Sequence, residues 1–242
     1  MIKFFIKILL NFFDNISQKK VLKVLRNIFR DKIDFIIDVG SHHGETIIFL
    51  EKHFEYKKIY AFEPSFFNYQ HLKKKVSSLN KDSKIILSNK GIGIKSEKKI
   101  LTQSTDSSSC SYCSIKKDSK YFLNKIKLFN FNKNKIANTE ETQTISLSLF
   151  VKINKIKHID YLKTDTEGFE LNVLKSLGGF ISQIKLIHFE HHYDDMYIKN
   201  YQFTDIHKFL LKNNFTQIYK LKMFFRKSFE YLYANNLFSN EY

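Results

Sequence analysis

Hydrophobic positions divide the chain into a helical N-terminal region and a longer part in which strands and helices alternate. Through residues 1–30 apolar side chains recur at helical spacing, including Val21, Leu25 and Ile28. From position 33, short β-branched runs typical of buried parallel strands occur at 33–39, 58–62, 84–87, 158–162 and 184–189. Helical patterns lie between them, at 44–53, at 64–79, up to about 153 and from about 167.

Strands that alternate with helices indicate βαβ units and a parallel sheet. After a last helix at 204–213, strand patterns at 215–219 and 229–233 predict an antiparallel hairpin at one edge. The expected fold class is therefore α/β, with a doubly wound, Rossmann-like, mostly parallel sheet and N-terminal helices. Such sheets bind ligands at the carboxyl ends of their strands.

Regular patterning fades between about residues 91 and 139, where Ser/Thr clusters and an Asn/Lys run occur. We expect a largely irregular insertion with one helix near 121–128, because long irregular segments often act as lids or binding loops. The predicted organisation is a helical extension, residues 1–30, and one domain, residues 31–242, that contains this insertion.

The charge of the chain raises two kinds of partner. The formal net charge is +16, which is typical of proteins that bind nucleic acid or anionic membranes. Only three of the 40 basic residues are arginines, and arginine is the side chain that reads phosphates and bases best. We therefore interpret the charge as mostly compositional and do not expect a nucleic-acid partner.

The first 13 residues are rich in Phe, Ile and Leu, and Lys3 and Lys7 interrupt them. The stretch is too short to span a bilayer, and no signal-peptide cleavage pattern follows it. It predicts either a helix packed on the core or a peripheral contact with the inner face of a membrane. With only two cysteines, Cys110 and Cys113, the chain has no disulfide framework, so a cytoplasmic location is expected.

Candidate cofactor-binding residues follow the first two predicted strands. Gly40 permits a tight turn and Gly44 opens the next helix, but neither a Gly-x-Gly-x-x-Gly pattern nor a phosphate-binding lysine is present. Glu63 lies 23 residues after Gly40, the spacing of a ribose-binding carboxylate, and Pro64 keeps it extended. The set favours S-adenosylmethionine over NAD and resembles class I methyltransferases; its members are Asp38, Gly40, Ser41, Gly44, Glu63 and Pro64.

A narrower resemblance covers roughly residues 33–220. The segment 159–175, with Lys163-Thr164-Asp165-Thr166-Glu167-Gly168-Phe169-Glu170 at its centre, is similar to the signature of the FkbM methyltransferases. The lead-in at 144–147 also fits, whereas His42 and His43 stand where small residues are common in that family. The resemblance implies O-methylation of hydroxyls on sugars, glycans, lipid-linked precursors or related metabolites, often in polysaccharide biosynthesis.

Candidate catalytic residues gather after the strands at 158–162 and 184–189. Methyl transfer to a hydroxyl needs an aligned acceptor and a base for its proton, so His or carboxylate side chains are suitable. In order of preference the candidates are His191, His192, Glu190 and Asp165. Asp165 and Glu190 could also hold Mg²⁺, although the sequence does not require a metal.

Two other functions stay open at this stage. An RNA methyltransferase would use the positive charge, but the chain contains no Asn/Asp-Pro-Pro-aromatic run. A non-catalytic binding module with a methyltransferase fold is the other alternative, and the presence of Asp38, Gly40, Glu63 and Asp165 argues against it.

Overall fold

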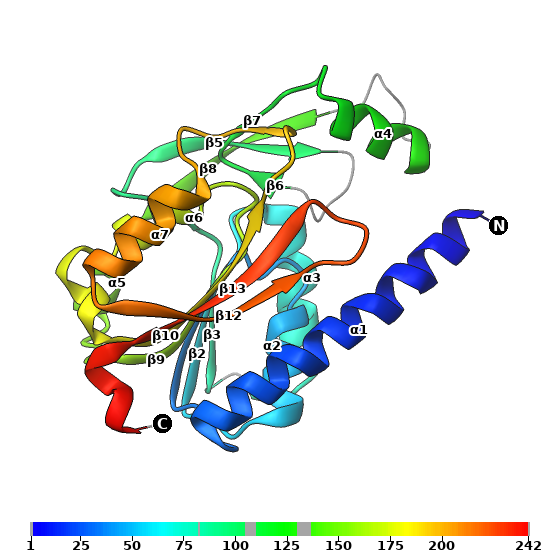
Figure 1. Cartoon of the computed structure of the whole chain (residues 1–242). Coiled ribbons are helices and arrows are strands. Elements are labelled where there is room, and N and C mark those ends of the chain that lie inside the picture. Colours follow the sequence, from blue (N-terminus) through cyan, green and yellow to red (C-terminus); the bar gives the residue numbers. More distant parts are fainter. Residues whose placement is uncertain (1, 82, 105–109, 130–136, 242) are drawn as a thin grey trace.

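The computed structural model describes residues 2–81, 83–104, 110–129 and 137–241, with the side chains of residues 2–9, 11, 104, 129, 137 and 239–241 excepted. Figure 1 shows the elements, which are α1 (Ile2–Phe29), β1 (Phe35–Val39), α2 (Glu45–His53), β2 (Lys58–Phe62), α3 (Phe66–Ser77), β3 (Ile85–Ser88), β4 (Gly91–Ile92), β5 (Lys98–Ser104), β6 (Cys110–Ser111), β7 (Ser114–Ile115), α4 (Lys120–Phe129), β8 (Ala137–Ile145), α5 (Leu147–Ile153), β9 (Ile159–Thr164), α6 (Glu170–Lys175), β10 (Ile184–His192), β11 (Tyr197–Ile198), α7 (Phe203–Lys212), β12 (Phe215–Lys222) and β13 (Ser228–Asn235).

The central sheet has seven strands in the order β12-β13-β10-β9-β1-β2-β3. The pairs from β10 to β3 are parallel, and β13 pairs antiparallel with both β10 and β12. The predicted α/β class, the mostly parallel sheet and the C-terminal hairpin are therefore confirmed. One detail of the hairpin is that its second strand, β13, lies inside the sheet while β12 forms the edge.

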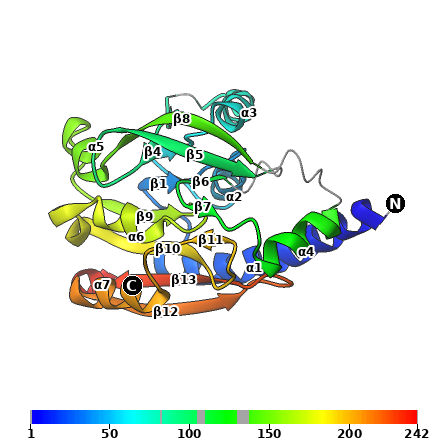
Figure 2. The same cartoon turned by 90° about the horizontal axis from the view of Figure 1, so that it is seen from above.

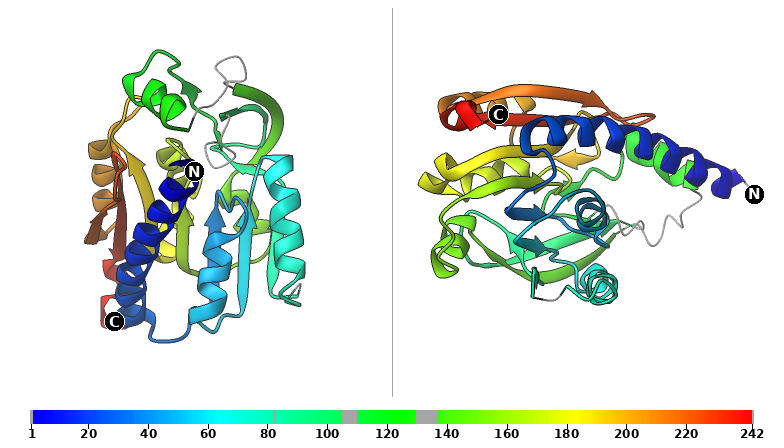
Figure 3. Two further views of the ribbon diagram at one scale, coloured as in Figure 1. Left: turned by 90° about the vertical axis from the view of Figure 1, so that its right-hand side faces the viewer. Right: turned by 90° about the horizontal axis from the view of Figure 1, so that it is seen from below.

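Helices cover both faces of this sheet (Figures 1 and 3). On one face α1, α2 and α3 pack against alternate strand residues, with Leu25, Ile47 and Leu72 fully buried. On the other face α5, α6 and α7 cover the remaining strand residues, including Leu162 and Phe189. Because strand residues alternate between faces, the central strands β1 and β2 are buried on both sides and consist mostly of apolar residues.

The segment at 91–139 differs from the expected irregular insertion. A second sheet with the order β4-β8-β5-β6 runs through it, and β5 pairs antiparallel with β8 from Lys98↔Gln143 to Ser104↔Ala137 (Figure 2). The expectation was wrong because these strands are polar: of their side chains only a few, such as Leu101, Thr142 and Thr144, are buried. β-branched threonines suit such a half-exposed pair. The predicted helix near 121–128 is present as α4.

Two helix boundaries also depart from the sequence pattern. The helix expected from about residue 167 begins at Glu170, because Glu167 and Gly168 both have positive φ angles, 53° and 100°. The N-terminal helices form one continuous helix, α1. Among the described residues no helix has both the length and the apolar character needed to cross a bilayer.

Ser65 begins α3 directly after Pro64. Its buried hydroxyl accepts a hydrogen bond from the main-chain N–H of Asn68, 3.4 Å away, and so satisfies one of the unpaired donors of the first turn. We expect Ser65→Ala to lower the free energy of unfolding by about 1 kcal/mol in chemical denaturation. Ser96→Ala, at an exposed loop position, is the matched control and should change it by less than about 0.5 kcal/mol. Equal losses in both variants would contradict the assigned cap.

Candidate functional site

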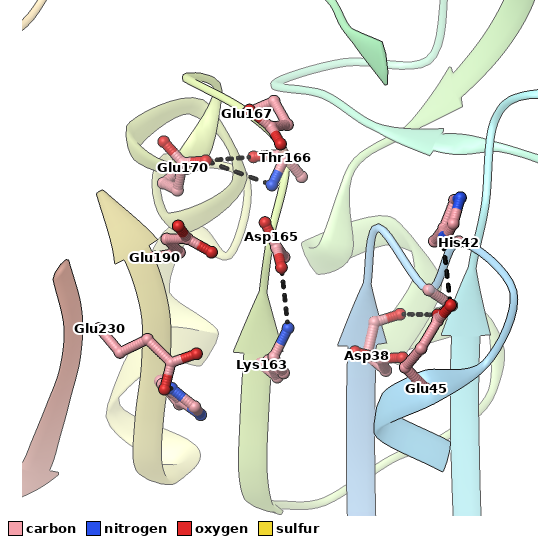
Figure 4. Close-up of polar contacts among 12 residues, drawn as sticks. Asp38, His42, Glu45, Lys163, Asp165, Thr166, Glu167, Glu170, Glu190 and Glu230 are labelled. Atoms are coloured by element: carbon pink, nitrogen blue, oxygen red, sulfur yellow. Dashed lines mark hydrogen bonds and ion pairs between the residues drawn. The ribbon is translucent and has the colours of Figure 1, made fainter. Parts of the chain in front are cut away.

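A cleft of 1410 Å³ opens at the carboxyl ends of β1, β2, β9 and β10. Beyond β1 the sheet continues with β2 and β3 on one side, and beyond β9 it continues with β10 on the other. The order of the strands therefore reverses between β1 and β9, and doubly wound sheets bind ligands at such a point. Residues of α1, α4 and the turn between β12 and β13 complete its walls. Most of the candidate cofactor and catalytic residues therefore meet in one cleft, and Figure 4 shows the carboxylates that gather there.

The turn after β1 packs directly against the end of β9. Gly40 has a φ of 82°, and a Cβ at this position would lie 2.0 Å from the carbonyl oxygen of Asp165. In return the N–H of Asp165 donates to the carbonyl of Val39 at 2.9 Å. Only glycine permits this approach. Ser41 follows Gly40 and lines the cleft. Gly44, with a φ of 90°, directly precedes α2 and does not line the cleft.

Glu63 lies at the tip of β2 and lines the cleft, where it is only 3% exposed. One carboxylate oxygen accepts the N–H of His42 at 2.9 Å, and the other accepts the N–H of Ser65 at 2.9 Å. Burial raises the pKa of Glu63 to about 7, although these two N–H groups oppose the rise. Pro64 lines the cleft beside it, and Asn89 holds the strand end by donating to the carbonyls of Glu63 and Pro64.

Asp38 lies below the cleft rather than in its wall. The side chain is fully buried and does not line the cavity, and burial raises its pKa. Within the described part of the chain, neither carboxylate oxygen has a hydrogen-bond partner, while the hydroxyl of Ser41 donates to the main-chain oxygen of Asp38. Asp38 lies in register with Lys163, which lines the cleft, so its role toward a bound ligand stays a prediction.

The preferred catalytic candidate, His191, lies on the wrong face of the sheet. β10 continues to His192, so Glu190 and His192 point into the cleft and His191 points to the opposite side. There its ring packs against Tyr193 and Phe203, and burial lowers its pKa to about 3. We therefore withdraw His191 as the general base.

His192 is surrounded by three carboxylates. Its Nε2 lies 3.3 Å from Glu167 and 3.6 Å from Glu190, and its Nδ1 lies 3.4 Å from Asp194. Burial lowers the pKa of His192, but Glu167, Glu190 and Asp194 outweigh this effect and raise it to about 10. The three carboxylates favour the protonated imidazole, which makes His192 a poorer proton acceptor than Glu190.

The remaining two candidates differ in basicity. Burial raises the pKa of Asp165, but Lys163, whose Nζ lies 3.2 Å away, and His192 outweigh burial, so the pKa is lowered. Burial raises the pKa of Glu190 to about 7, with His192 and Arg226 opposing the rise. A general base works best with a pKa near the working pH, so Glu190 is the best-matched base of the site.

Further polar residues of the cleft escaped the sequence analysis. The hydroxyl of Tyr161 lies 2.5 Å from Nδ1 of His188, whose Nε2 lies 3.2 Å from Glu230. Arg226, in the turn before β13, forms an ion pair with Asp14 of α1 at 2.8 Å. His188 lies two residues before Glu190 and therefore on the same face of β10. This spacing is the one sequence signal that could have placed His188 in the cleft.

The side-chain atoms that could bind a metal ion gather at a different place from the expected one. Among the described residues, one group could hold an ion, in the turn after β1: His42, His43 and Glu45, whose ligand atoms lie within 4.8 Å of one another. Asp165 and Glu190 belong to no such group. The rings of His42 and His43 are stacked at 3.8 Å with an angle of 15°, so they cannot both direct a nitrogen at one ion without rotating.

The sheet order and the cleft define the class of protein as a Rossmann-like methyltransferase fold, and solved structures agree. A methyltransferase FkbM from Methylobacillus flagellatus KT is 14% identical with a TM-score of 0.55, over 86% of this chain and 45% of that chain. An rRNA methylase from Streptococcus thermophilus is 11% identical with a TM-score of 0.51, over 89% of this chain and 94% of that one. TrmK of M. capricolum, solved with S-adenosylhomocysteine, is 13% identical with a TM-score of 0.51, over 89% of this chain and 67% of that one.

The family follows from the sequence itself. The methyltransferase FkbM domain matches residues 38–216, and the chain belongs to this methyltransferase family. The resemblance expected from the segment at 159–175 is thereby confirmed. The chain spans less than half of the Methylobacillus protein. A comparison with curated proteins gives no match.

Proposed function

We propose that the protein is an S-adenosylmethionine-dependent O-methyltransferase that acts on a hydroxyl of a sugar, glycan or related metabolite. One observation carries the proposal: a single cleft contains a buried carboxylate at the tip of β2, Glu63, and a carboxylate with a pKa of about 7 at the tip of β10, Glu190. The first suits a ribose and the second suits a hydroxyl that loses its proton on methylation.

The cofactor side of the cleft fits a nucleoside with two neighbouring hydroxyls. Each oxygen of Glu63 accepts one main-chain N–H and keeps capacity for another hydrogen bond. Ser41 and Pro64 line the same part of the cleft. Two structures of similar fold contain the proposed cofactor or its product: Sp1610 of Streptococcus pneumoniae, with a TM-score of 0.50, and TrmK of M. capricolum.

The reaction follows from these groups. When bound, the cofactor supplies a methyl group attached to a positively charged sulfur. The chain has to align an acceptor hydroxyl with that methyl group and to remove the proton of the hydroxyl. Glu190 would take up the proton that the acceptor hydroxyl loses on methylation. His192, held as a cation between Glu190 and Glu167, keeps the Glu190 carboxylate in place.

The acceptor side favours a polyhydroxylated molecule. Asp165, Glu167 and Glu190 line the same cleft and can accept several hydroxyl donors at once. A phosphate-rich acceptor would meet repulsion from these carboxylates. The structural neighbours whose names include RNA are only 9–14% identical and share the fold alone, so the RNA alternative stays a prediction.

The test compares cells that express the wild-type gene, a deletion and a Glu190→Gln gene. Mass spectrometry of their glycans, glycolipids and soluble sugars should show one species that lacks a methyl group in the deletion strain. The wild-type gene should restore it and the Glu190→Gln gene should not. If no saccharide changes while a methylated nucleoside disappears from the RNA, the proposed acceptor class is wrong.

A further inference from the structure

The opening of the cleft is bordered by exposed apolar side chains from three separate segments. Phe12 of α1 is 58% exposed, Leu123 and Leu128 of α4 are 39% and 53% exposed, and Phe225 of the β12–β13 turn is 71% exposed. Figures 1 and 2 show the first half of α1, α4 and the β12–β13 turn on the same side of the molecule. We call these three segments the cleft rim: residues 10–20, 120–128 and 223–227.

The rim is a built structure rather than a loose end. The ring of Phe13 lies 4.5 Å from that of Phe224 and 5.2 Å from that of Phe225. The ion pair between Asp14 and Arg226 joins the same two segments. The neighbours of Phe12 and Phe225 therefore hold both side chains in exposed positions. Exposure of these apolar groups to water is unfavourable in free energy, and contact with an apolar partner surface would remove that cost.

The charged side chains of the cleft rim indicate the chemical class of its partner. The rim carries exposed lysines at 19, 20, 127 and 227, and its one acidic residue, Asp14, is already paired with Arg226. An apolar surface surrounded by lysines complements an anionic lipid bilayer, where acyl chains receive the apolar groups and phosphates receive the ammonium groups. The rim's one arginine, Arg226, is the side chain type that best reads phosphates and bases, and it is engaged by Asp14, which favours lipid over single-stranded nucleic acid.

We propose that the cleft rim docks on an anionic phospholipid membrane, so that the cleft opens toward the bilayer surface. The prediction of a membrane contact through residues 1–13 is thereby extended to two segments far away in the sequence. Where the proposed function holds, this placement also deepens it, because an acceptor sugar carried on a lipid would enter the cleft from the membrane side.

The test is flotation of the full-length protein with vesicles of phosphatidylcholine alone or of phosphatidylcholine with phosphatidylglycerol. The protein should float with the anionic vesicles, and added salt should weaken the binding. The double variant Phe12→Ser/Leu123→Ser, at two rim positions that do not line the cleft, should bind about tenfold more weakly, because two apolar side chains leave the interface. The matched control is Ile153→Ser, since Ile153 is 63% exposed on α5, away from the rim, and it should bind as the wild type does.

The proposal fails if wild-type protein does not float with anionic vesicles, or if the double variant and the Ile153→Ser control bind equally well. It also fails if the protein binds single-stranded RNA instead of vesicles, and the double variant binds that RNA as tightly as the wild type does. Calorimetric titration with S-adenosylhomocysteine separates this proposal from the enzymatic one. The double variant should retain cofactor affinity, and a protein that floats but binds no cofactor would leave membrane docking standing while overturning the proposed function.

Discussion

Replacing Glu190 with Gln should slow methyl transfer by about 10²–10⁴-fold, the range that a positioned general base contributes. Glutamine retains the size and the hydrogen-bonding oxygen of Glu190 but cannot take up a proton. Single-turnover assays with the acceptor found by mass spectrometry measure the effect, and cofactor affinity should stay unchanged. Glu141→Gln, at an exposed position on β8, is the matched control and should have no effect. Wild-type turnover by Glu190→Gln would exclude Glu190 as the base.

The same residue sets an expected pH dependence. The raised pKa of Glu190, about 7, means that the carboxylate form increases as the pH rises, so turnover should rise through neutral pH and level off above it. Stability should move in the opposite sense. An acid whose pKa is higher in the folded protein stabilises the fold below its unfolded pKa and loses this contribution as the pH rises through about 7. Glu190→Gln should remove the dependence of turnover and reduce that of stability, to which Glu63, with a pKa also raised to about 7, contributes in the same direction.

Replacing Glu63 with Ala should weaken binding of S-adenosylhomocysteine by about 100-fold. Hydrogen bonds from ribose hydroxyls to a charged acceptor contribute about 1.5–3 kcal/mol, and the substitution removes the acceptor completely. The N–H groups of His42 and Ser65 also lose their partner, so the turn after β1 becomes less ordered. Isothermal titration calorimetry gives the affinity, and Glu63→Gln, which keeps one oxygen, should show an intermediate loss. Unchanged affinity in Glu63→Ala would place the ribose elsewhere.

The first two strands and their ligand-binding ends could be predicted because the information is local. The runs at 33–39 and 58–62 are buried on both faces, which requires continuous apolar sequence. The distance from Gly40 to Glu63 is fixed by one βαβ unit, so spacing alone predicted that Glu63 lies at the tip of β2, while its contact with a ribose stays a prediction. By contrast, β5 and β8 lie more than 30 residues apart and are mostly polar, and no local pattern indicates that they pair.

The error at His191 has a simple cause. Ending the strand at Phe189 left the next three residues as a loop, in which any of them could face the ligand. Extending the strand to His192 fixes the side of each residue by alternation. The basicity of Glu190 and His192 could not be predicted at all, because it depends on carboxylates and an arginine that three other segments bring within reach.

The position of β13 has a consequence for how the molecule folds. β13 follows β12 in the chain but lies between β10 and β12, so β12 cannot join the sheet until β13 has been inserted. Before that step the edge of β10 is open, and Glu230 and Arg226 are absent from the cleft. Cofactor binding should therefore appear no earlier than the docking of β13 on β10, a step that protection of the β10 amides against hydrogen exchange reports.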